Sequence, residues 1–268
     1  LSSSSAASDV YKRQVLQGCS DYRNSLSLQN GTPAANQTPV GENILAAHGS
    51  QWIYSPSGDP QILARSLAGD FLYFTADATP LYNHYFYANL REVAHASRSI
   101  VWLKPDRIVV YDRARSQSAG YFKRFYLNLP DTQANVVVNE ATVRATAREG
   151  ATPKAELFVT ALLPAGAAPQ ITDISSGQPS GGEDMKSRLF TEAPGAPQDA
   201  RFLHVLEGTA AGVATPAATQ LVTSADGAFE GALSGDTLVL FRKDLATSGQ
   251  SFSVVAPALS LIPICRCR

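Results

Sequence analysis

The stretch "SRSIVWLKPDRIVVYDRARS", residues 97–116, decides the fold. It holds two apolar runs, Ile100–Leu103 and Ile108–Tyr111, separated by Lys104–Arg107. Pro105 fixes its own φ and has no N–H to give to a β-ladder, so it belongs in a turn. Apart from Leu103, the residues of both runs are β-branched or aromatic, which suits a pleated surface. The stretch therefore predicts an antiparallel hairpin that turns at Lys104–Arg107.

The same pattern of short apolar runs between turn residues continues along the chain. The other runs are Phe71–Phe74, Phe122–Leu129, Val136–Val138, Glu156–Leu163, Phe202–Leu206, Leu238–Phe241 and Phe252–Val255. Residues 141–150 alternate polar and apolar side chains, the period-two pattern of a strand with one wet face. Segments 175–184, 192–200 and 208–219 are rich in Gly, Pro, Ala and polar residues and predict loops. These features predict an all-β fold with few or no helices: a large antiparallel β-sandwich, supersandwich-like.

Both ends of the chain differ from this pattern. Residues 1–14 and 259–268 have no hydrophobic periodicity. Codons for Tyr11–Gln14 can be reverse-complementary to codons for Leu259–Ile262, as in a sequencing adapter on both sides of an insert. We therefore expect 1–14 and 259–268 to be adapter-derived and disordered, and residues 15–258 to form one domain. The chain is then expected to be a fragment of metagenomic type, whose signal peptide would have been lost.

Composition excludes several function classes. Without the two ends, Cys19 is the one cysteine left, so no disulfide framework forms within residues 15–258. The ends carry four Lys or Arg and one Asp, so the net charge of −1 becomes −4. A net negative charge does not favour binding to the negatively charged backbone of nucleic acid. No apolar run approaches the ~18 residues that a membrane span needs.

Four short motifs follow one another between residues 69 and 113. Gly69-Asp70 precedes a predicted strand, Asp77-Ala78-Thr79 leads to Tyr82, and Arg98 opens the hairpin whose second strand ends in Val109–Arg113. In order and spacing, residues 68–83, 96–116, 123–130 and 201–208 resemble the C-terminal β domain of heparinase II/III-like polysaccharide lyases. The resemblance covers most of residues 40–245.

The resemblance implies a two-part secreted or periplasmic enzyme, with an N-terminal α/α toroid followed by the β-sandwich. Such lyases cleave uronic-acid polysaccharides by β-elimination. A base removes the proton α to the carboxylate, polar or cationic groups neutralise that carboxylate, and an acid protonates the leaving oxygen. The toroid would hold most of these groups, so we expect this chain to be inactive without the toroid of its parent. The implied partners are that toroid and an acidic polysaccharide.

A metal site is also implied for some relatives, near the start of the β part. Where relatives often carry His-Asn, the nearest match here is Gln29-Asn30. The four histidines, His48, His84, His95 and His204, show no zinc-ligand spacing. We therefore expect no cofactor and no metal in this chain, and leave open a structural metal ion in the full-length parent.

The densest polar and aromatic stretch is "LYNHYFYANLREVAH", residues 81–95. Its tyrosines could stack on pyranose rings, and its arginine could meet a carboxylate. The catalytic candidates are Tyr82, His84, Tyr85 and Arg91, and the substrate-binding candidates are Tyr87, Asn89 and His95. The alternative is a half-buried loop whose tyrosines serve packing.

Other residues favour structural roles. His204 lies in the middle of a predicted strand and is expected to be packed or at an edge. Asp112-Arg113 is expected to be a salt bridge where the second hairpin strand leaves the core. No Gly-x-Ser-x-Gly elbow supports a hydrolase triad. The leading hypothesis is the β-sandwich part of a polysaccharide lyase. The alternative is a non-catalytic carbohydrate-binding or structural β-sandwich module.

Overall fold

The computed structural model describes residues 20, 23–31, 49–51, 58–67, 69–83, 90–130, 135–175 and 185–244, and the backbone of 252–255. Strand accounts for 59% and helix for 3%, and no helix within the described part of the chain reaches seven residues. The all-β prediction is therefore confirmed. The predictions for residues 1–14 and 259–268 lie outside the described residues. Within those described, no helix is long and apolar enough to cross a membrane.

The largest sheet of the described chain has eight antiparallel strands in the order β2-β3-β4-β5-β12-β9-β8-β7. We call it the central sheet. Its strands are β2 (Gln61–Ser66), β3 (Phe71–Asp77), β4 (Val93–Leu103), β5 (Arg107–Ser116), β7 (Val136–Asn139), β8 (Thr142–Glu149), β9 (Thr152–Leu163) and β12 (Asp199–Ala210).

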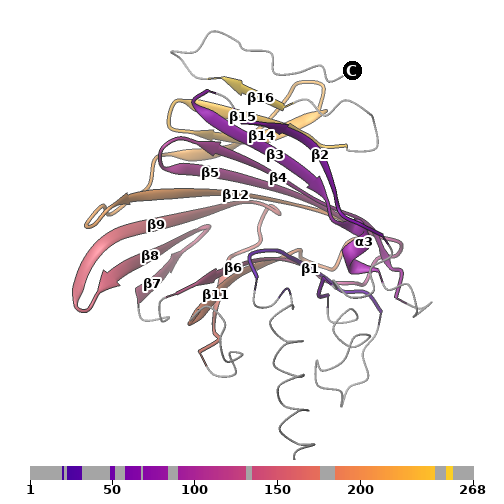
Figure 1. Cartoon of the computed structure of the whole chain (residues 1–268), viewed down its shortest axis with the longest axis horizontal. Helices are drawn as coiled ribbons and strands as arrows, with labels where there is room; N and C mark the ends of the chain where they lie inside the picture. Colours follow the sequence, from indigo (N-terminus) through magenta and orange to yellow (C-terminus); the bar gives the residue numbers. More distant parts are fainter. Residues whose placement is uncertain are drawn as a thin grey trace, which may run out of the picture.

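Two four-stranded antiparallel sheets cover its two faces, so the described strands form three layers (Figure 1). The lower sheet has the order β1-β6-β11-β10 and the upper sheet the order β13-β14-β15-β16. Their strands are β1 (Leu26–Leu28), β6 (Lys123–Leu129), β10 (Gln170–Asp173), β11 (Ser187–Glu192), β13 (Thr219–Thr223), β14 (Phe229–Ser234), β15 (Thr237–Arg242) and β16 (Phe252–Val255).

Strand β5 shows how one sequence serves two cores. Successive side chains of a strand point to opposite faces of the sheet. Val110 and Ala114 pack in the core between the central and lower sheets. Val109 and Tyr111 pack in the core between the central and upper sheets. Full burial of a single valine stabilises the fold by roughly 1.5–3 kcal/mol. A strand buried on both faces reads as a continuous apolar run, which explains "IVVY".

The predicted antiparallel pairing of 100–103 with 108–111 is confirmed, but the turn is shorter than predicted, because Arg107 pairs with Leu103 and begins β5. Ile100 pairs with Val110, Val101 with Val109, and Trp102 with Ile108. The other predicted runs also lie in strands, namely β3, β6, β7, β9, β12, β15 and β16. Loops occupy 193–198 and 211–218, but 192, 199–200, 208–210 and 219, predicted as loop, are strand. Residues 199–200 and 208–210 extend β12, which pairs with both β5 and β9, whereas residue 192 ends β11 and residue 219 begins β13. Most of segment 175–184 lies outside the described residues.

The expected salt bridge between Asp112 and Arg113 is wrong. Strand β5 continues to Ser116, and both residues are buried, at 0% and 6% exposure. Their side chains point to opposite faces of the central sheet because they are adjacent in a strand. Asp112 pairs with Arg98 on the lower face, and Arg113 contacts the Tyr111 ring on the upper face.

Candidate functional site

Stretch 81–95 begins in α3 (Thr79–Tyr82), a single turn that follows β3. The Asp77 carboxylate accepts hydrogen bonds from the backbone N–H and the hydroxyl of Thr79, at 2.8 and 2.5 Å. The Thr79 hydroxyl in turn accepts the backbone N–H of Ala96, at 2.9 Å. The Asp77-Ala78-Thr79 motif therefore fixes the chain at the exit of β3 by side-chain to backbone hydrogen bonds.

Asn30, just beyond β1, joins the end of α3 to residues 90–92. It is fully buried, and its amide nitrogen donates to the carbonyls of Tyr82 and Leu90, at 2.6 and 3.1 Å. Its amide oxygen accepts the backbone N–H of Glu92, at 2.7 Å. Asn83 adds a second tie through Val93, with distances of 2.8 and 3.3 Å. Residues 82–83 and 90–93, on either side of the undescribed segment 84–89, are thus held together.

The candidate residues divide between segment 84–89 and the residues on either side of it. His84, Tyr85, Tyr87 and Asn89 lie outside the described residues. Arg91 is exposed and directly follows Leu90, whose carbonyl accepts a hydrogen bond from Asn30. The structure therefore presents Arg91 to solvent beside segment 84–89, which keeps it available to a charged ligand.

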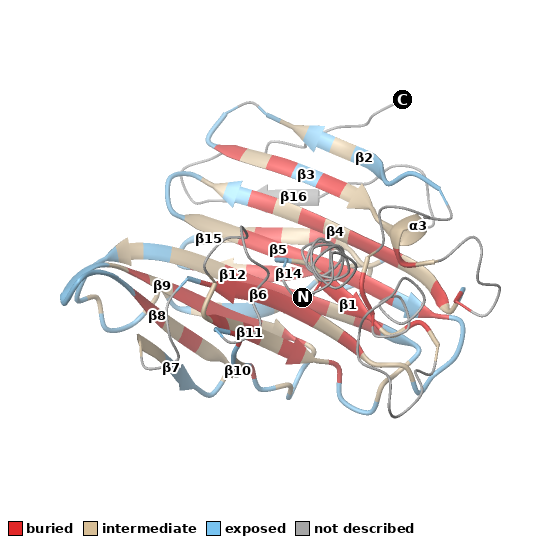
Figure 2. Cartoon of the chain, turned by 60° about the horizontal axis from the view of Figure 1, so that its bottom comes forward, coloured by how far each residue is buried: buried red, intermediate tan, exposed pale blue. Residues whose placement is uncertain are grey.

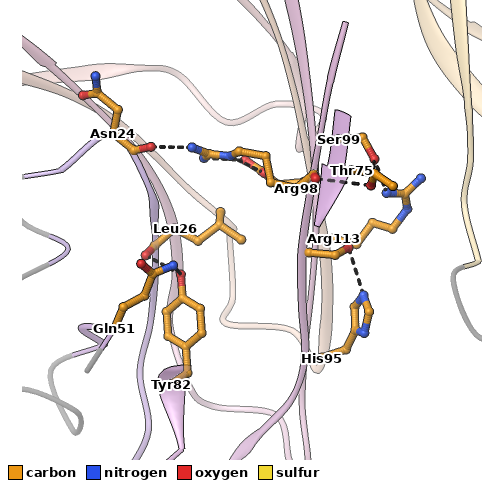
Figure 3. Close-up of polar contacts among 11 residues, drawn as sticks. Asn24, Leu26, Gln51, Thr75, Tyr82, His95, Arg98, Ser99 and Arg113 are labelled. Carbon is orange, nitrogen blue, oxygen red and sulfur yellow. Dashed lines mark hydrogen bonds and ion pairs between the residues drawn. The ribbon is translucent and has the colours of Figure 1, made fainter. Parts of the chain in front are cut away.

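Tyr82 is built into the core. It is 1% exposed, and its hydroxyl donates to the carbonyl of Leu26 at 2.8 Å (Figure 3). The same hydroxyl accepts a hydrogen bond from the Gln51 amide at 3.0 Å. Burial raises the pKa of Tyr82 above its ordinary value, with only partial relief from Gln51. This placement favours the packing alternative for Tyr82.

Gln51 reaches Tyr82 because Gly49 brings its segment close to β1. The Gly49 carbonyl accepts the backbone N–H of Leu28 at 3.0 Å. Gly49 has a φ of +96°, and a Cβ there would lie 2.6 Å from the Ser27 hydroxyl and 2.8 Å from the Leu28 nitrogen. A side chain at position 49 would therefore displace this segment from β1.

An ion pair lies beside Tyr82 between the central and lower sheets. The Arg98 guanidinium donates to both carboxylate oxygens of Asp112, at 2.7 and 2.8 Å. Asp112 is fully buried, and the Arg98 side chain is 21% exposed. Arg98 also donates to the carbonyl of Asn24, which precedes β1 (Figure 3). The pair thus joins β4, β5 and the start of the lower sheet.

His95 lies on the other face of the central sheet from Tyr82. Its Nε2 is 3.0 Å from the Ser97 hydroxyl, and Ser97 pairs with Arg113 across the hairpin. Burial lowers the pKa of His95 below its ordinary value. Tyr82 packs instead with the residues of the lower core. The structure therefore does not bring Tyr82 and His95 into one groove.

The residues at Gln29-Asn30 do not fit a metal site. Both side-chain oxygens accept backbone N–H groups, of Phe122 at 3.1 Å and of Glu92 at 2.7 Å. A cation needs such oxygens as ligands. Among the residues described, no group of three or more His, Cys, Asp or Glu could hold a metal ion.

Sequence reasoning missed the roles of Asn30, Gln51 and Arg98 in supporting this region. Asn30 and Gln51 act through hydrogen bonds to residues more than thirty positions away, which leave no periodic pattern in the sequence. Arg98 carried a signal, because a hairpin centred on Pro105 places it opposite Asp112, as observed.

Comparison with solved structures identifies the architecture. Heparan sulfate lyase HepC from Pedobacter heparinus matches 78% of this chain with a TM-score of 0.51 and 12% identity. Heparinase III matches 88% with a TM-score of 0.50 and 11% identity, and a further heparinase III matches 85% with 0.50 and 8%. The chain has a heparinase-like fold. It spans 28–34% of the length of these three proteins.

These structural comparisons show the fold alone. No protein-family model and no curated protein matches the sequence. The resemblance inferred from the motif order is confirmed at the level of the fold.

Proposed function

We propose that this chain is the β-sandwich part of a polysaccharide lyase that cleaves uronic-acid polysaccharides by β-elimination. The observation that carries the proposal is the heparinase-like three-sheet fold over 78–88% of the chain. The remaining catalytic groups would come from an N-terminal α/α toroid in the parent. The parent would be secreted or periplasmic, where such polymers are found.

Within this chain, the contribution to the chemistry would come from stretch 81–95. Asn30 and Asn83 hold the chain together on both sides of segment 84–89, at residues 82–83 and 90–93. Arg91 is exposed beside it and would neutralise the carboxylate next to the proton that is removed. His84 and Tyr85 are the candidates for proton transfer, and Tyr87 and Asn89 for binding sugar rings and hydroxyls.

The experiment has two parts. The purified chain alone, given alginate or heparan sulfate, should release no unsaturated product that absorbs in the ultraviolet, because base, carboxylate partner and substrate clamp must be held together. In the intact parent, His84→Ala and Arg91→Ala should each lower kcat/KM at least tenfold. Arg148→Ala, at an exposed arginine on β8, is the matched control and should change it less than twofold.

A non-catalytic carbohydrate-binding module is the second candidate. The observation that favours it is the placement of Tyr82 and His95 on opposite faces of the central sheet, away from a shared groove. Full activity of both parent variants would retire the role of stretch 81–95 and leave this domain as a binding or scaffold module. Product release by the chain alone would show that the catalytic groups lie within it.

A further inference from the structure

The lower sheet covers only part of the lower face of the central sheet. The lower core includes Val110 on β5 and reaches Ile100 on β4 and Ile108 on β5, which are only partly buried against it. Figure 2 brings this side of the molecule forward and shows β2 and β3 clear of the strands of the lower sheet. The part of the lower face that lies beyond the lower core we call the open face, and its residues are Ile62, Arg65, Leu72, Phe74 and Trp102.

The strand register brings an arginine and two aromatic rings together on the open face. Phe74 lies opposite Ile100 and therefore shares the lower face with it. Arg65 lies opposite Phe74 on the other side, across β2 and β3. Trp102 lies opposite Leu72, one step diagonally from Phe74. Side chains at diagonal positions are about 7–8 Å apart, so a single ligand can contact all three.

Large apolar side chains of this region are accessible to solvent. Trp102 is 38% and Phe74 37% exposed, while Ile62 and Leu67, at the edge of the sheet, are 59% and 67% exposed. A soluble protein that keeps several large apolar side chains together in water commonly uses that surface to bind something. The Trp102 Nε1 donates to the Pro105 carbonyl at 3.2 Å, which limits rotation of the ring. A ring held in this way loses little conformational freedom on binding.

Arg65 supplies the open face with a free positive charge. It is exposed, and within the described part of the chain no ion pair or hydrogen bond holds its guanidinium. The carboxylates of Asp70 and Asp106 lie in the turns beyond the ends of these strands. Lys104, in the second turn, donates to the Gly69 carbonyl at 3.0 Å. The open face therefore combines exposed rings with an accessible guanidinium, which is complementary to an anion.

This combination favours an acidic sugar over the other occupants of an apolar surface. An apolar protein partner would bury the guanidinium without a counter-ion, which is costly. A second copy bound through the open face about a two-fold axis would bring Arg65 into the interface twice, with no carboxylate on the face to pair it. A pyranose ring stacks on an aromatic ring, and a carboxylate or sulfate on the sugar pairs with a guanidinium through two N–H groups.

We propose that the open face binds an acidic polysaccharide, separately from stretch 81–95. Trp102 and Phe74 stack on sugar rings, and Arg65 pairs with a carboxylate or sulfate group of the same polymer. The choice of a polysaccharide as the ligand rests on the proposed function. The exposed rings and the unpaired guanidinium are observed independently of it.

The test is calorimetric titration of the full chain with oligosaccharides of three kinds. Alginate carries only carboxylate, heparin carries carboxylate and sulfate, and dextran is neutral. Alginate or heparin should bind at least tenfold more tightly than dextran, and the preferred polymer identifies the anion. Arg65→Ala should remove most of this preference, whereas Trp102→Ala should raise Kd at least tenfold for every oligosaccharide that binds. The controls Arg148→Ala and Val137→Ala, at exposed positions on β8 and β7, should each change Kd less than twofold.

Several outcomes would overturn the proposal. They are no binding by the unaltered chain, equal affinity for dextran and alginate, and equal losses in the variants and their controls. Polyglutamate that binds as tightly as alginate would indicate an acidic protein as the ligand. Dimerisation in sedimentation experiments that Trp102→Ala abolishes would assign the open face to a second copy. If Trp102→Ala fails to fold, Arg65→Ala still decides the matter, because it changes an exposed side chain on an edge strand.

The intact parent separates this site from catalysis. There, Arg65→Ala should raise KM at least threefold and leave kcat unchanged, because the open face binds the polymer away from stretch 81–95. An unchanged KM would mean that the rest of the parent covers the open face, and would overturn the proposal. A failure of this proposal leaves the lyase proposal standing, because the release of unsaturated product is measured independently.

Discussion

His204 should make the stability of this protein strongly dependent on pH. The side chain is fully buried on β12, and its ring stacks on Phe125 with centroids 3.8 Å apart. Its Nε2 is 3.1 Å from the Thr191 hydroxyl, and its Nδ1 has no partner. Burial, with a smaller contribution from the charge of Arg98, lowers the pKa of His204 to about 3. The prediction of a packed histidine is confirmed.

The size of the effect follows from the two protonation states. In the unfolded chain the imidazole has its ordinary pKa of 6.5 and binds a proton below that pH, whereas the folded protein binds it only near pH 3. Between these values the unfolded state holds one more proton, so the free energy of unfolding falls as the pH falls. The slope is about 1.4 kcal/mol per pH unit. From pH 6 to pH 4, His204 should remove about 2–3 kcal/mol.

Urea unfolding at several pH values measures this. The His204→Phe variant keeps an aromatic ring against Phe125 and cannot titrate. The difference in free energy of unfolding between the original protein and this variant should fall by about 2–3 kcal/mol from pH 6 to pH 4, while contributions of other groups cancel. Thr191→Val, which keeps the histidine, should retain the slope of the original protein. Parallel curves for the original protein and His204→Phe would refute the reasoning.

Three further predictions concern buried polar contacts, each measured by urea unfolding at pH 7. Arg98→Met should cost about 3–5 kcal/mol because it leaves Asp112 buried without its partner, and the double variant with Asp112→Leu should recover most of the loss; equal losses in both would contradict this. Asn30→Ala should cost about 3 kcal/mol by leaving three backbone groups unpaired, and an unchanged midpoint would rule out its role in joining α3 to residues 90–92. Tyr111→Phe should cost about 1–3 kcal/mol by removing the 2.6 Å hydrogen bond to buried Glu230; no loss would mean that the bond is not needed to hold the upper sheet.

Position within a sheet explains some of the strands that the sequence did not predict. Interior strands such as β5 and β12 bury both faces and therefore show long apolar runs. Strands β1, β2, β10, β11, β13 and β14 were missed; β11 and β14 lie inside their sheets, and the other four lie at edges. The residues of β2, β10 and β13 are mostly exposed or half-exposed, and "QILARS", "QITD" and "TQLVT" hold no apolar run longer than three residues. Edge strands form because a neighbour offers hydrogen bonds, which composition does not reveal.

The site was less predictable because its supports are long-range. Asn30 acts on residues 52 and 60 positions away, and Gln51 on one 31 positions away. No local rule relates such pairs. The stretch 81–95 was identified by its density of polar and aromatic residues, a signal that does not distinguish a core tyrosine such as Tyr82 from one that faces a ligand.

The pairing of Arg98 with Asp112 could have been predicted from the opening stretch alone. A hairpin that turns symmetrically about Pro105 places residues at equal distances before and after it opposite one another, and Arg98 and Asp112 each lie seven positions away. Cross-strand partners share a face, so an arginine opposite an aspartate predicts an ion pair across the hairpin. Arg113, one position further, must then point to the other face. Charges at the end of an apolar run therefore indicate a buried pair when the register supplies a partner, and the end of the strand only when it does not.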